Sequence, residues 1–136
     1  MMSDIQARRI LLVDDEVSLL DCVKMMLEFD GHQVETATNG SGALSLFDKG
    51  GFDLVITDYS MAGMKGDALA IAIKKRAPDH PIIMITAHAG ILESTGNPLT
   101  GVDFVLSKPF QVADLRAAIA KVSAKADGKG RDESER

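Results

Sequence analysis

The clearest structural signal in this chain is residues 54–66, LVITDYSMAGMKG. Its first four residues are uncharged and mostly aliphatic, which is typical of a short strand buried on both faces of a sheet. The run stops at the carboxylate of Asp58, and the glycines and small residues after it indicate a turn. In an open parallel sheet, ligands bind at the carboxyl ends of the strands, because the loops there open into a crevice. An isolated aspartate can also simply end a strand or cap a turn, so the other strand ends must establish what Asp58 does.

Four more short segments are predicted to be strands, at residues 10–13, 33–37, 82–86 and 103–107. The segment 33–37 is the weakest of them, and we expect it to be peripheral in the sheet. The other three end in polar side chains: Asp14-Asp15-Glu16 after the first, Thr86 at the end of 82–86, and Lys108-Pro109 after 103–107.

Helical patterns separate these strands. The first helix is predicted over residues 16–30, with Leu20, Val23 and Leu27 on its buried face and Val17, Leu19, Met25 and Met26 broadening that face. Further helices are predicted from a cap at Asn39 or Ser41 to Phe47, from Lys65 or Gly66 to Arg76, and over 111–125. Residues 87–101 leave two alternatives open, a short helix around 91–95 and a mobile loop, because Gly and Pro interrupt the segment.

Strands that alternate with helices predict an α/β fold with helices on both faces of a parallel sheet. Right-handed crossovers leave few topologies, and we expect a three-layer sandwich whose five strands lie in the flavodoxin-like order 2-1-3-4-5. In this order the first and third strands are neighbours, so Asp14 and Asp15 would lie close to Asp58. Thr86 and Lys108 would flank them from the fourth and fifth strands.

The composition is that of a single soluble domain. The chain has 136 residues, 46% of them hydrophobic, and a formal charge of −5, which argues against direct binding of nucleic acid. Cys22, the one cysteine, lies in an apolar helical pattern and is expected to be a buried, inert thiol, with a reactive thiol as the alternative. No apolar run approaches the roughly 20 residues that cross a bilayer and no signal peptide is recognisable, so we expect a cytoplasmic protein with no membrane partner.

The two ends of the chain are polar. We expect residues 1–7 to be a disordered lead-in and residues 8–125 to be the folded domain. Residues 126–136 contain nothing to bury, and we expect them to be a disordered tail or the beginning of a truncated linker.

The charges at the predicted sheet edge indicate a metal site. The carboxylates of Asp14, Asp15 and Asp58 with the ammonium of Lys108 leave a formal −2, and two like charges about 4 Å apart repel by about 4 kcal/mol at an effective dielectric constant of 20. A divalent cation would cancel that repulsion. Oxygen ligands without a His or Cys cluster favour Mg²⁺, with Mn²⁺ as an alternative, over zinc.

These motifs, taken in order, resemble the receiver domain of two-component response regulators, in the CheY-like superfamily. The resemblance covers about residues 8–125 and rests on Val13-Asp14-Asp15-Glu16, Thr57-Asp58 with Gly66 after it, Thr86-Ala87, and Lys108-Pro109-Phe110.

The resemblance implies a phospho-accepting switch in a phosphorelay. Asp58 would take a phosphoryl group from a sensor histidine kinase or a phosphotransfer protein. Asp15, Asp58 and the backbone carbonyl of Ser60 would bind Mg²⁺, and Asp14 would act through a metal-bound water. Thr86 and Lys108 would contact the phosphoryl oxygens, and the Lys108–Pro109 bond would be cis. The domain would be no enzyme beyond promoting its own phosphorylation and dephosphorylation, and it would control an output partner or domain, with a homodimer left open.

The chain departs from the family pattern at several positions. Val105 stands where the family usually has an aromatic switch residue, and Phe104 lies beside it. Ala62 replaces a usual proline and Lys65 a usual acidic residue. Ser60 and His88 occupy positions whose side chains tune hydrolysis of the acyl phosphate in the family; His88 either acts on the attacking water or lies in solvent.

Three other classes of function remain as alternatives. A Mg²⁺-dependent aspartyl-phosphate hydrolase would need a second acid where this chain has Ser60. A flavodoxin-like nucleotide or flavin module would need a glycine-rich phosphate loop after the first strand, where this chain has three acids. A degenerate receiver would act through protein contacts without phosphorylation.

Overall fold

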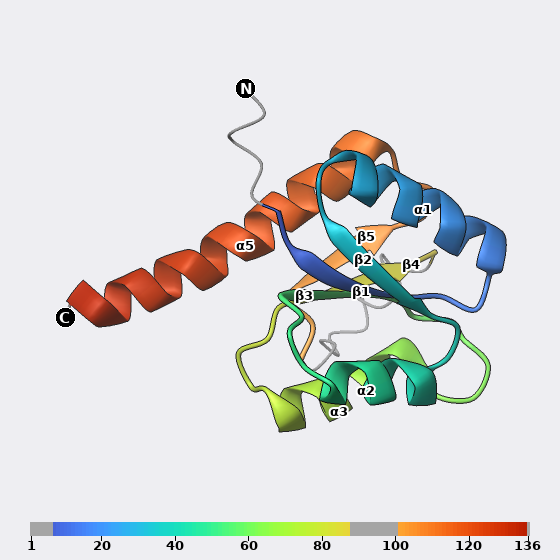
Figure 1. Ribbon diagram of the computed structural model, residues 1–136, viewed down its shortest axis with the longest axis horizontal. Helices are drawn as coiled ribbons and strands as arrows, with labels where there is room; N and C mark the ends of the chain where they lie inside the picture. The colour runs from blue at the N-terminus through green and yellow to red at the C-terminus, as the bar shows by residue number, and fades with distance from the viewer. Residues whose placement is uncertain (1–6, 88–100, 136) are drawn as a thin grey trace.

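A parallel sheet between two layers of helices forms the body of the protein (Figure 1). The computed structural model describes residues 7–87 and 101–135, and the side chains among them up to residue 123. Within these ranges the elements are β1 (Arg9–Val13), α1 (Val17–Phe29), β2 (Gln33–Ala37), α2 (Gly40–Asp48), β3 (Leu54–Asp58), α3 (Gly66–Arg76), β4 (Ile82–Thr86), β5 (Phe104–Ser107) and α5 (Val112–Glu135).

The five strands lie in the order β2-β1-β3-β4-β5, and all four pairings are parallel. This confirms the three-layer α/β sandwich with the flavodoxin-like strand order. It also confirms the peripheral position of the second strand, since β2 is an edge. The central strands β3 and β4 are buried along their whole length, as their continuous apolar sequences predict.

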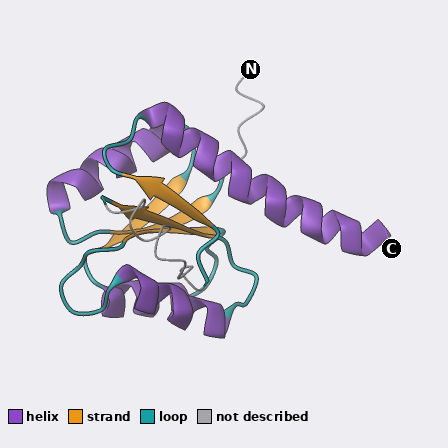
Figure 2. Ribbon diagram, turned by 180° about the vertical axis from the view of Figure 1, so that it is seen from behind, coloured by secondary structure: helices purple, strands orange, loops and turns teal. Residues whose placement is uncertain are grey.

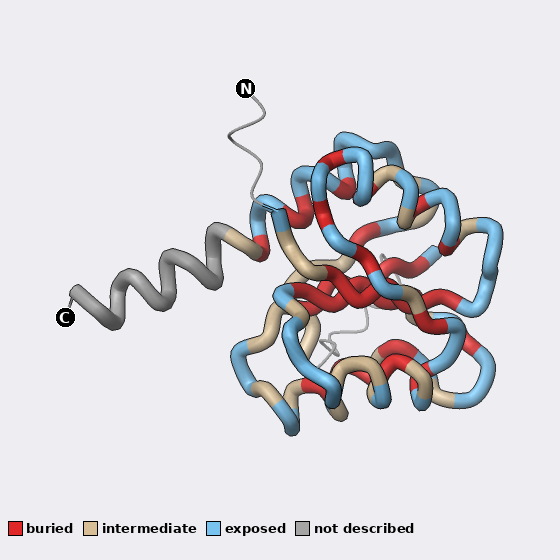
Figure 3. Tube along the Cα trace, in the orientation of Figure 1, coloured by how far each residue is buried: buried red, intermediate tan, exposed pale blue. Residues whose placement is uncertain are grey.

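Side chains alternate between the two faces of the sheet, because successive residues of a strand point to opposite sides. Ile10 and Leu12 of β1 pack in one core with α1 and α5, whereas Leu11 and Val13 pack in a second core with α2 and α3. Figure 2 shows these two helical layers on opposite sides of the strands, and Figure 3 shows that the buried residues concentrate on the sheet and on the helix faces toward it. None of the described helices is both long enough and apolar enough to cross a membrane.

The buried face of α1 is narrower than its sequence predicts. Leu20, Val23 and Leu27 are buried as expected, but Val17 is 55% exposed and Met25 is 69% exposed. The prediction that Cys22 is buried is also wrong, since its side chain is exposed. Each helical residue is rotated about 100° from the last, so Cys22 and Val23 point in different directions although both lie within one apolar pattern.

The last helix continues beyond Lys125. Its backbone is helical as far as Glu135, where the composition suggested a disordered tail or linker, and it extends away from the body of the protein (Figure 1). A helix that has already formed gains one hydrogen bond for each residue added, so a polar segment with nothing to bury can still continue it. The described part of the chain leaves out residues 1–6, 88–100 and 136. The predictions for His88 and for a helix or loop within residues 87–101 fall on that middle segment and therefore lie outside the described residues.

Two histidines lie in environments that disfavour their charged form. His32 is buried after α1, and its Nδ1 accepts a hydrogen bond of 3.0 Å from the backbone N–H of Arg8. Burial lowers the pKa of His32 from its ordinary value of 6.5, against the opposing charge of Asp30. Burial, with the nearby charge of Lys74, also lowers the pKa of His80, which packs edge-on against Phe47 with ring centroids 4.9 Å apart.

Stability is therefore expected to fall in mild acid. A histidine whose pKa is depressed in the folded state contributes its full stabilisation above the unfolded pKa of about 6.5 and loses it as the pH falls toward the folded pKa. We expect the free energy of unfolding, measured by urea denaturation, to decrease from pH 7.5 to pH 5. In His32→Asn, whose amide oxygen can still accept the Arg8 N–H, the decrease should be smaller. An identical pH dependence in this variant would show that His32 does not contribute.

Candidate functional site

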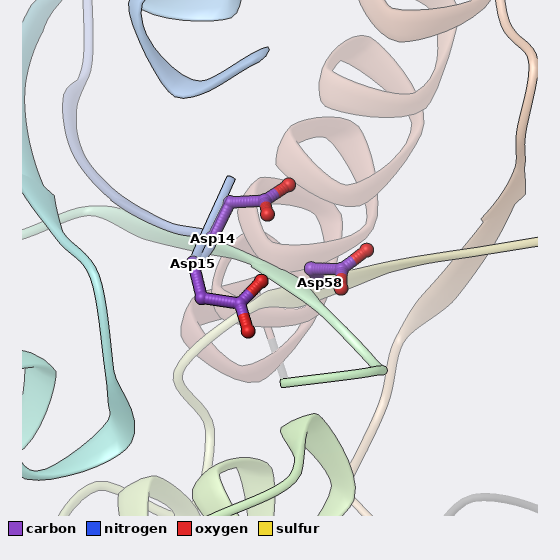
Figure 4. A group of neighbouring side chains, drawn as sticks. All are labelled: Asp14, Asp15 and Asp58. Atoms are coloured by element: carbon purple, nitrogen blue, oxygen red, sulfur yellow. The ribbon is translucent and has the colours of Figure 1, made fainter. Parts of the chain in front are cut away.

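Three carboxylates meet at the carboxyl edge of the sheet. One oxygen atom from each of Asp14, Asp15 and Asp58 lies within 4.8 Å of the others, and Figure 4 shows the three side chains gathered beside the end of β3. Asp14 is 5% exposed and Asp58 is 4% exposed, while Asp15 is open to solvent. The sequence prediction that these residues come together is confirmed, and its cause is the pairing of β1 with β3, which places Val13 opposite Thr57.

Backbone amides hold two of the carboxylates in place. The N–H of Glu16 donates to Asp14 Oδ1 at 2.9 Å, at the beginning of α1. The N–H of Ala62, in the β3–α3 loop, donates to Asp15 Oδ2 at 3.1 Å. These two groups were not predicted from the sequence, because every residue except proline carries the same N–H and only the chain path places it.

Lys108 supplies a positive charge. Its Nζ lies 2.7 Å from Asp58 Oδ1 and 3.9 Å from Asp14 Oδ2, although it follows the distant edge strand β5. The backbone N–H of Lys108 donates to the carbonyl of Thr86 at 2.9 Å, which ties the residue to the end of β4. The Lys108–Pro109 peptide bond is cis, as the family resemblance implied.

Burial and neighbouring charges shift the pKa values of Asp14 and Lys108. Burial raises the pKa of Asp14 above its usual 3.8, the hydrogen bond from the Glu16 N–H opposes that shift, and the charge of Asp58 adds to it. Burial by itself would lower the pKa of Lys108, but its hydrogen bond and charge interaction with Asp58 more than offset this and raise the pKa. The lysine is therefore charged at neutral pH and the carboxylates still outnumber it.

Thr86 and Ser60 lie at the same edge of the sheet. Thr86 is the last residue of β4 and is 1% exposed; the strand register pairs Asp58 with the residue before it, Ile85. Ser60 is exposed and belongs to the β3–α3 loop that follows Asp58. All the predicted site residues thus lie on the loops or strand ends of β1, β3, β4 and β5.

The donor set fits a hard divalent cation. Three carboxylates within reach of one another carry more negative charge than one lysine neutralises, and Mg²⁺ prefers oxygen ligands and retains several waters. One carboxylate of the three is exposed, so a hydrated ion has access to the cluster.

Phe104 and Val105 point to opposite faces of the sheet. Phe104 packs against the core under α5, and Nζ of Lys121 lies 5.7 Å from the centre of its ring. Because side chains alternate along a strand, Phe104 cannot occupy the space on the Val105 side. Phe104 therefore lies on the other face of the sheet from Val105, the position where the resemblance implied an aromatic residue.

An apolar groove lies beside the site, between α1 and the β5–α5 loop. Its volume is about 720 Å³, and its lining includes Ala87 and Lys108, whose Nζ contacts Asp58. Cys22, Met26 and Phe110 are among the residues that line it. No local pattern predicts this groove, since its two walls lie far apart in the chain.

Comparison with known proteins agrees with the fold and identifies the family. Residues 10–120 match the model of the response regulator receiver domain family. The transcriptional regulatory protein TrcR of Mycobacterium tuberculosis is 32% identical over 111 residues, which cover 82% of this chain and 43% of TrcR. A response regulator receiver domain protein from Clostridium thermocellum has a TM-score of 0.81 and 31% identity, covering 88% of this chain and 97% of that one. TrrA from Thermotoga maritima, solved in complex with Mg²⁺-BeF, has a TM-score of 0.73 and 35% identity, covering 85% of this chain and 98% of TrrA.

The chain belongs to the response regulator receiver domains, the signalling modules of two-component systems. It spans about half the length of the curated relatives it matches.

Removing the negative charge of Asp58 and removing the positive charge of Lys108 are expected to change stability in opposite directions. In buffer without metal, Asp58→Asn removes the repulsion from Asp14 and Asp15 and loses one ion pair, so the free energy of unfolding should rise by roughly 1 kcal/mol. Lys108→Met removes the cation that lies against Asp58 and Asp14 and should lower the free energy of unfolding by roughly 2 kcal/mol. Urea denaturation at neutral pH measures both. If Asp58→Asn were less stable than the wild type, the ion pair with Lys108 would outweigh the repulsion.

Proposed function

We propose that the domain is a phosphorylation-dependent switch that accepts a phosphoryl group on Asp58 with the help of Mg²⁺. One observation carries the proposal: Asp58 is nearly buried at the end of β3, with Lys108 Nζ at 2.7 Å and the carboxylates of Asp14 and Asp15 beside it. A carboxylate in such a setting is a competent nucleophile once the charge of the incoming phosphoryl oxygens is balanced.

Asp15, Asp58 and the backbone carbonyl of Ser60 are the proposed ligands of the cation, with Asp14 acting through a bound water. Mg²⁺, or Mn²⁺ in its place, would neutralise the carboxylates and the phosphoryl oxygens during transfer. The similarity to TrrA, solved in complex with Mg²⁺-BeF, supports a Mg²⁺ site in this chain.

In the transfer step, an Oδ atom of Asp58 attacks the phosphorus and forms a P–O bond. The P–N bond of a donor phosphohistidine breaks, and the histidine nitrogen leaves with the bonding electrons. Lys108 holds its ammonium next to the attacking carboxylate, where it can bind a phosphoryl oxygen. The product is an acyl phosphate, whose lability suits a signal of limited duration.

Thr86 and Lys108 are the proposed readout of the new charge. Thr86 ends β4 and Lys108 follows β5, and the N–H of Lys108 donates to the carbonyl of Thr86, so a displacement of one residue affects the other. Phosphorylation would thus change the charge locally and shift the equilibrium between two conformations of the segments that carry Thr86 and Lys108. Because Val105 is not aromatic, we propose that this chain switches without a buried aromatic residue.

The proposed donor is a sensor histidine kinase or a phosphotransfer protein in the cytoplasm. The chain spans only part of its regulator relatives, and α5 leaves the body of the domain as a long helix, which suits a connection to an output domain. Homodimerisation and direct action on a separate partner remain alternatives for the output. We do not propose direct nucleic-acid binding by the domain, which carries a formal −5.

Phosphoryl acceptance is expected to depend on both Asp58 and Mg²⁺. After incubation with acetyl phosphate and Mg²⁺, intact-mass spectrometry should show one added phosphoryl group on the wild type. None should appear on Asp58→Asn or when EDTA replaces Mg²⁺. Asp21→Asn, which changes an exposed aspartate of α1, is the matched control and should be modified like the wild type.

Failure of the wild type to gain mass would be followed by a test with beryllofluoride, which imitates a phosphoryl group without hydrolysing. Amide NMR shifts at the site with beryllofluoride would indicate a short-lived phosphoryl group. If beryllofluoride also left the spectrum unchanged, the domain would be a degenerate receiver that acts through protein contacts alone.

Cation affinity is expected to depend on Asp15. Asp15→Asn should weaken Mg²⁺ binding by more than tenfold, because it removes a charged ligand from the proposed set. The measurement is calorimetric titration of the metal-free protein, with Asp21→Asn as the control. Unchanged affinity would remove Asp15 from the ligand set.

A further inference from the structure

The β3–α3 loop, residues 59–65, is held to the domain at several points. Met61 is 3% exposed and belongs to the core under α2 and α3. Met64 packs against the same core. At the end of the loop, the N–H of Gly66 donates to the carbonyl of Tyr59 at 2.9 Å. The loop conformation is thus tied to the layer formed by α2 and α3.

Met64 lies directly over Gly40, the first residue of α2. A Cβ atom added to Gly40 would lie 2.6 Å from Met64 Sδ, 2.8 Å from its Cβ and 2.9 Å from its Cγ. Gly40 does not have a positive φ, so its backbone would accept an alanine. The lack of a side chain at this position therefore serves the approach of Met64 and not a turn.

A change of rotamer in Met64 would not make room for a side chain at Gly40. Rotation about χ1 moves Sδ and Cγ, but Cβ is attached to the backbone and stays where it is. An alanine at position 40 would therefore displace the backbone of the loop or the beginning of α2.

The same loop reaches the carboxylates. The N–H of Ala62 donates to Asp15 Oδ2 at 3.1 Å, and Ser60, whose carbonyl is a proposed metal ligand, is in the same segment. A displacement of the loop at Met64 would alter the position of the Ala62 amide relative to Asp15. Groups that orient metal ligands without touching the ion affect metal affinity strongly.

We propose that Gly40 and Met64 are positioning residues of the metal site: their close contact sets the position of the β3–α3 loop and so the orientation of Asp15 and of the Ser60 carbonyl. The part that concerns Mg²⁺ rests on the proposed function. The part that concerns Ala62 and Asp15 does not, since that hydrogen bond is present without a metal.

The test compares Gly40→Ala with Gly42→Ala. Both variants add one methyl group to the first turns of α2, but the three atoms nearest to a Cβ at Gly42 would be Asn39 Oδ1 at 3.3 Å and Ala37 Cβ and Asn39 Cγ at 3.9 Å, none of them in the loop. We expect Gly40→Ala to weaken Mg²⁺ binding roughly tenfold in calorimetric titration and Gly42→Ala to leave it within about twofold of the wild type. Met64→Ala, which removes the contact from the other side, should also weaken binding.

Two further measurements separate positioning from a general loss of stability. In metal-free protein, the backbone amide resonance of Ala62 should shift in Gly40→Ala and stay unchanged in Gly42→Ala. Ile119→Val, which removes a buried methyl group from the opposite core, should lower stability while leaving both the Ala62 resonance and the Mg²⁺ affinity unchanged.

Wild-type affinity in both Gly40→Ala and Met64→Ala would overturn the proposal while leaving the proposed function intact, and so would an equal loss of affinity in Ile119→Val. Absence of Mg²⁺ binding by the wild type would overturn the proposed function and the metal part of this inference together. The Ala62 resonance would still test whether Gly40 positions the loop.

Discussion

Repulsion between carboxylates that are held together at the end of a parallel sheet is the constraint around which this domain is built. Asp14 and Asp58 are nearly buried, and Asp15 lies within 4.8 Å of both. Water cannot screen the buried pair as it would screen surface charges, so the protein must supply compensation of its own. It does so with the ammonium of Lys108 and with the backbone N–H groups of Glu16 and Ala62. Every strand except the edge strand β2 ends at or next to one of the site residues.

The charge compensation by Lys108 connects β3 and β5, which are not neighbours in the sheet. Lys108 follows the edge strand β5, yet its ammonium lies on Asp58 at the end of β3, across the end of β4. The charge of Asp58 is thereby coupled to the β5–α5 connection and to Thr86. If Asp58 accepts a phosphoryl group, as we propose, the ion pair that now joins β3 to β5 must rearrange. The negative charge concentrated at Asp58 then accounts both for the ion pair in the resting state and for the proposed switch.

Much of the fold could be predicted from local pattern. Apolar runs without alternation identified the buried strands, and the sequence of strand and helix patterns was enough for the layered architecture and the strand order. Predictions failed where they depended on one side chain's direction. Cys22 and Met25 lie within the apolar pattern of α1 but point to solvent, because several residues of a broad apolar stripe share the pattern and only packing shows which of them meet the sheet. The end of α5 was also missed, since a polar segment can continue a helix that is already formed.

Local sequence is enough to establish which groups stand at the ends of the strands, and hence the chemistry available there: three acids, a threonine and a lysine at positions where parallel strands must end together. How those groups meet depends on the folded chain. The 2.7 Å contact of Lys108 with Asp58, the Ala62 amide on Asp15, the placement of Phe104 under α5 and the fit of Met64 over Gly40 all join residues whose approach depends on sheet pairing, loop conformation and packing between layers. Side-chain type is encoded residue by residue, but distance between remote residues is a property of the whole folded chain.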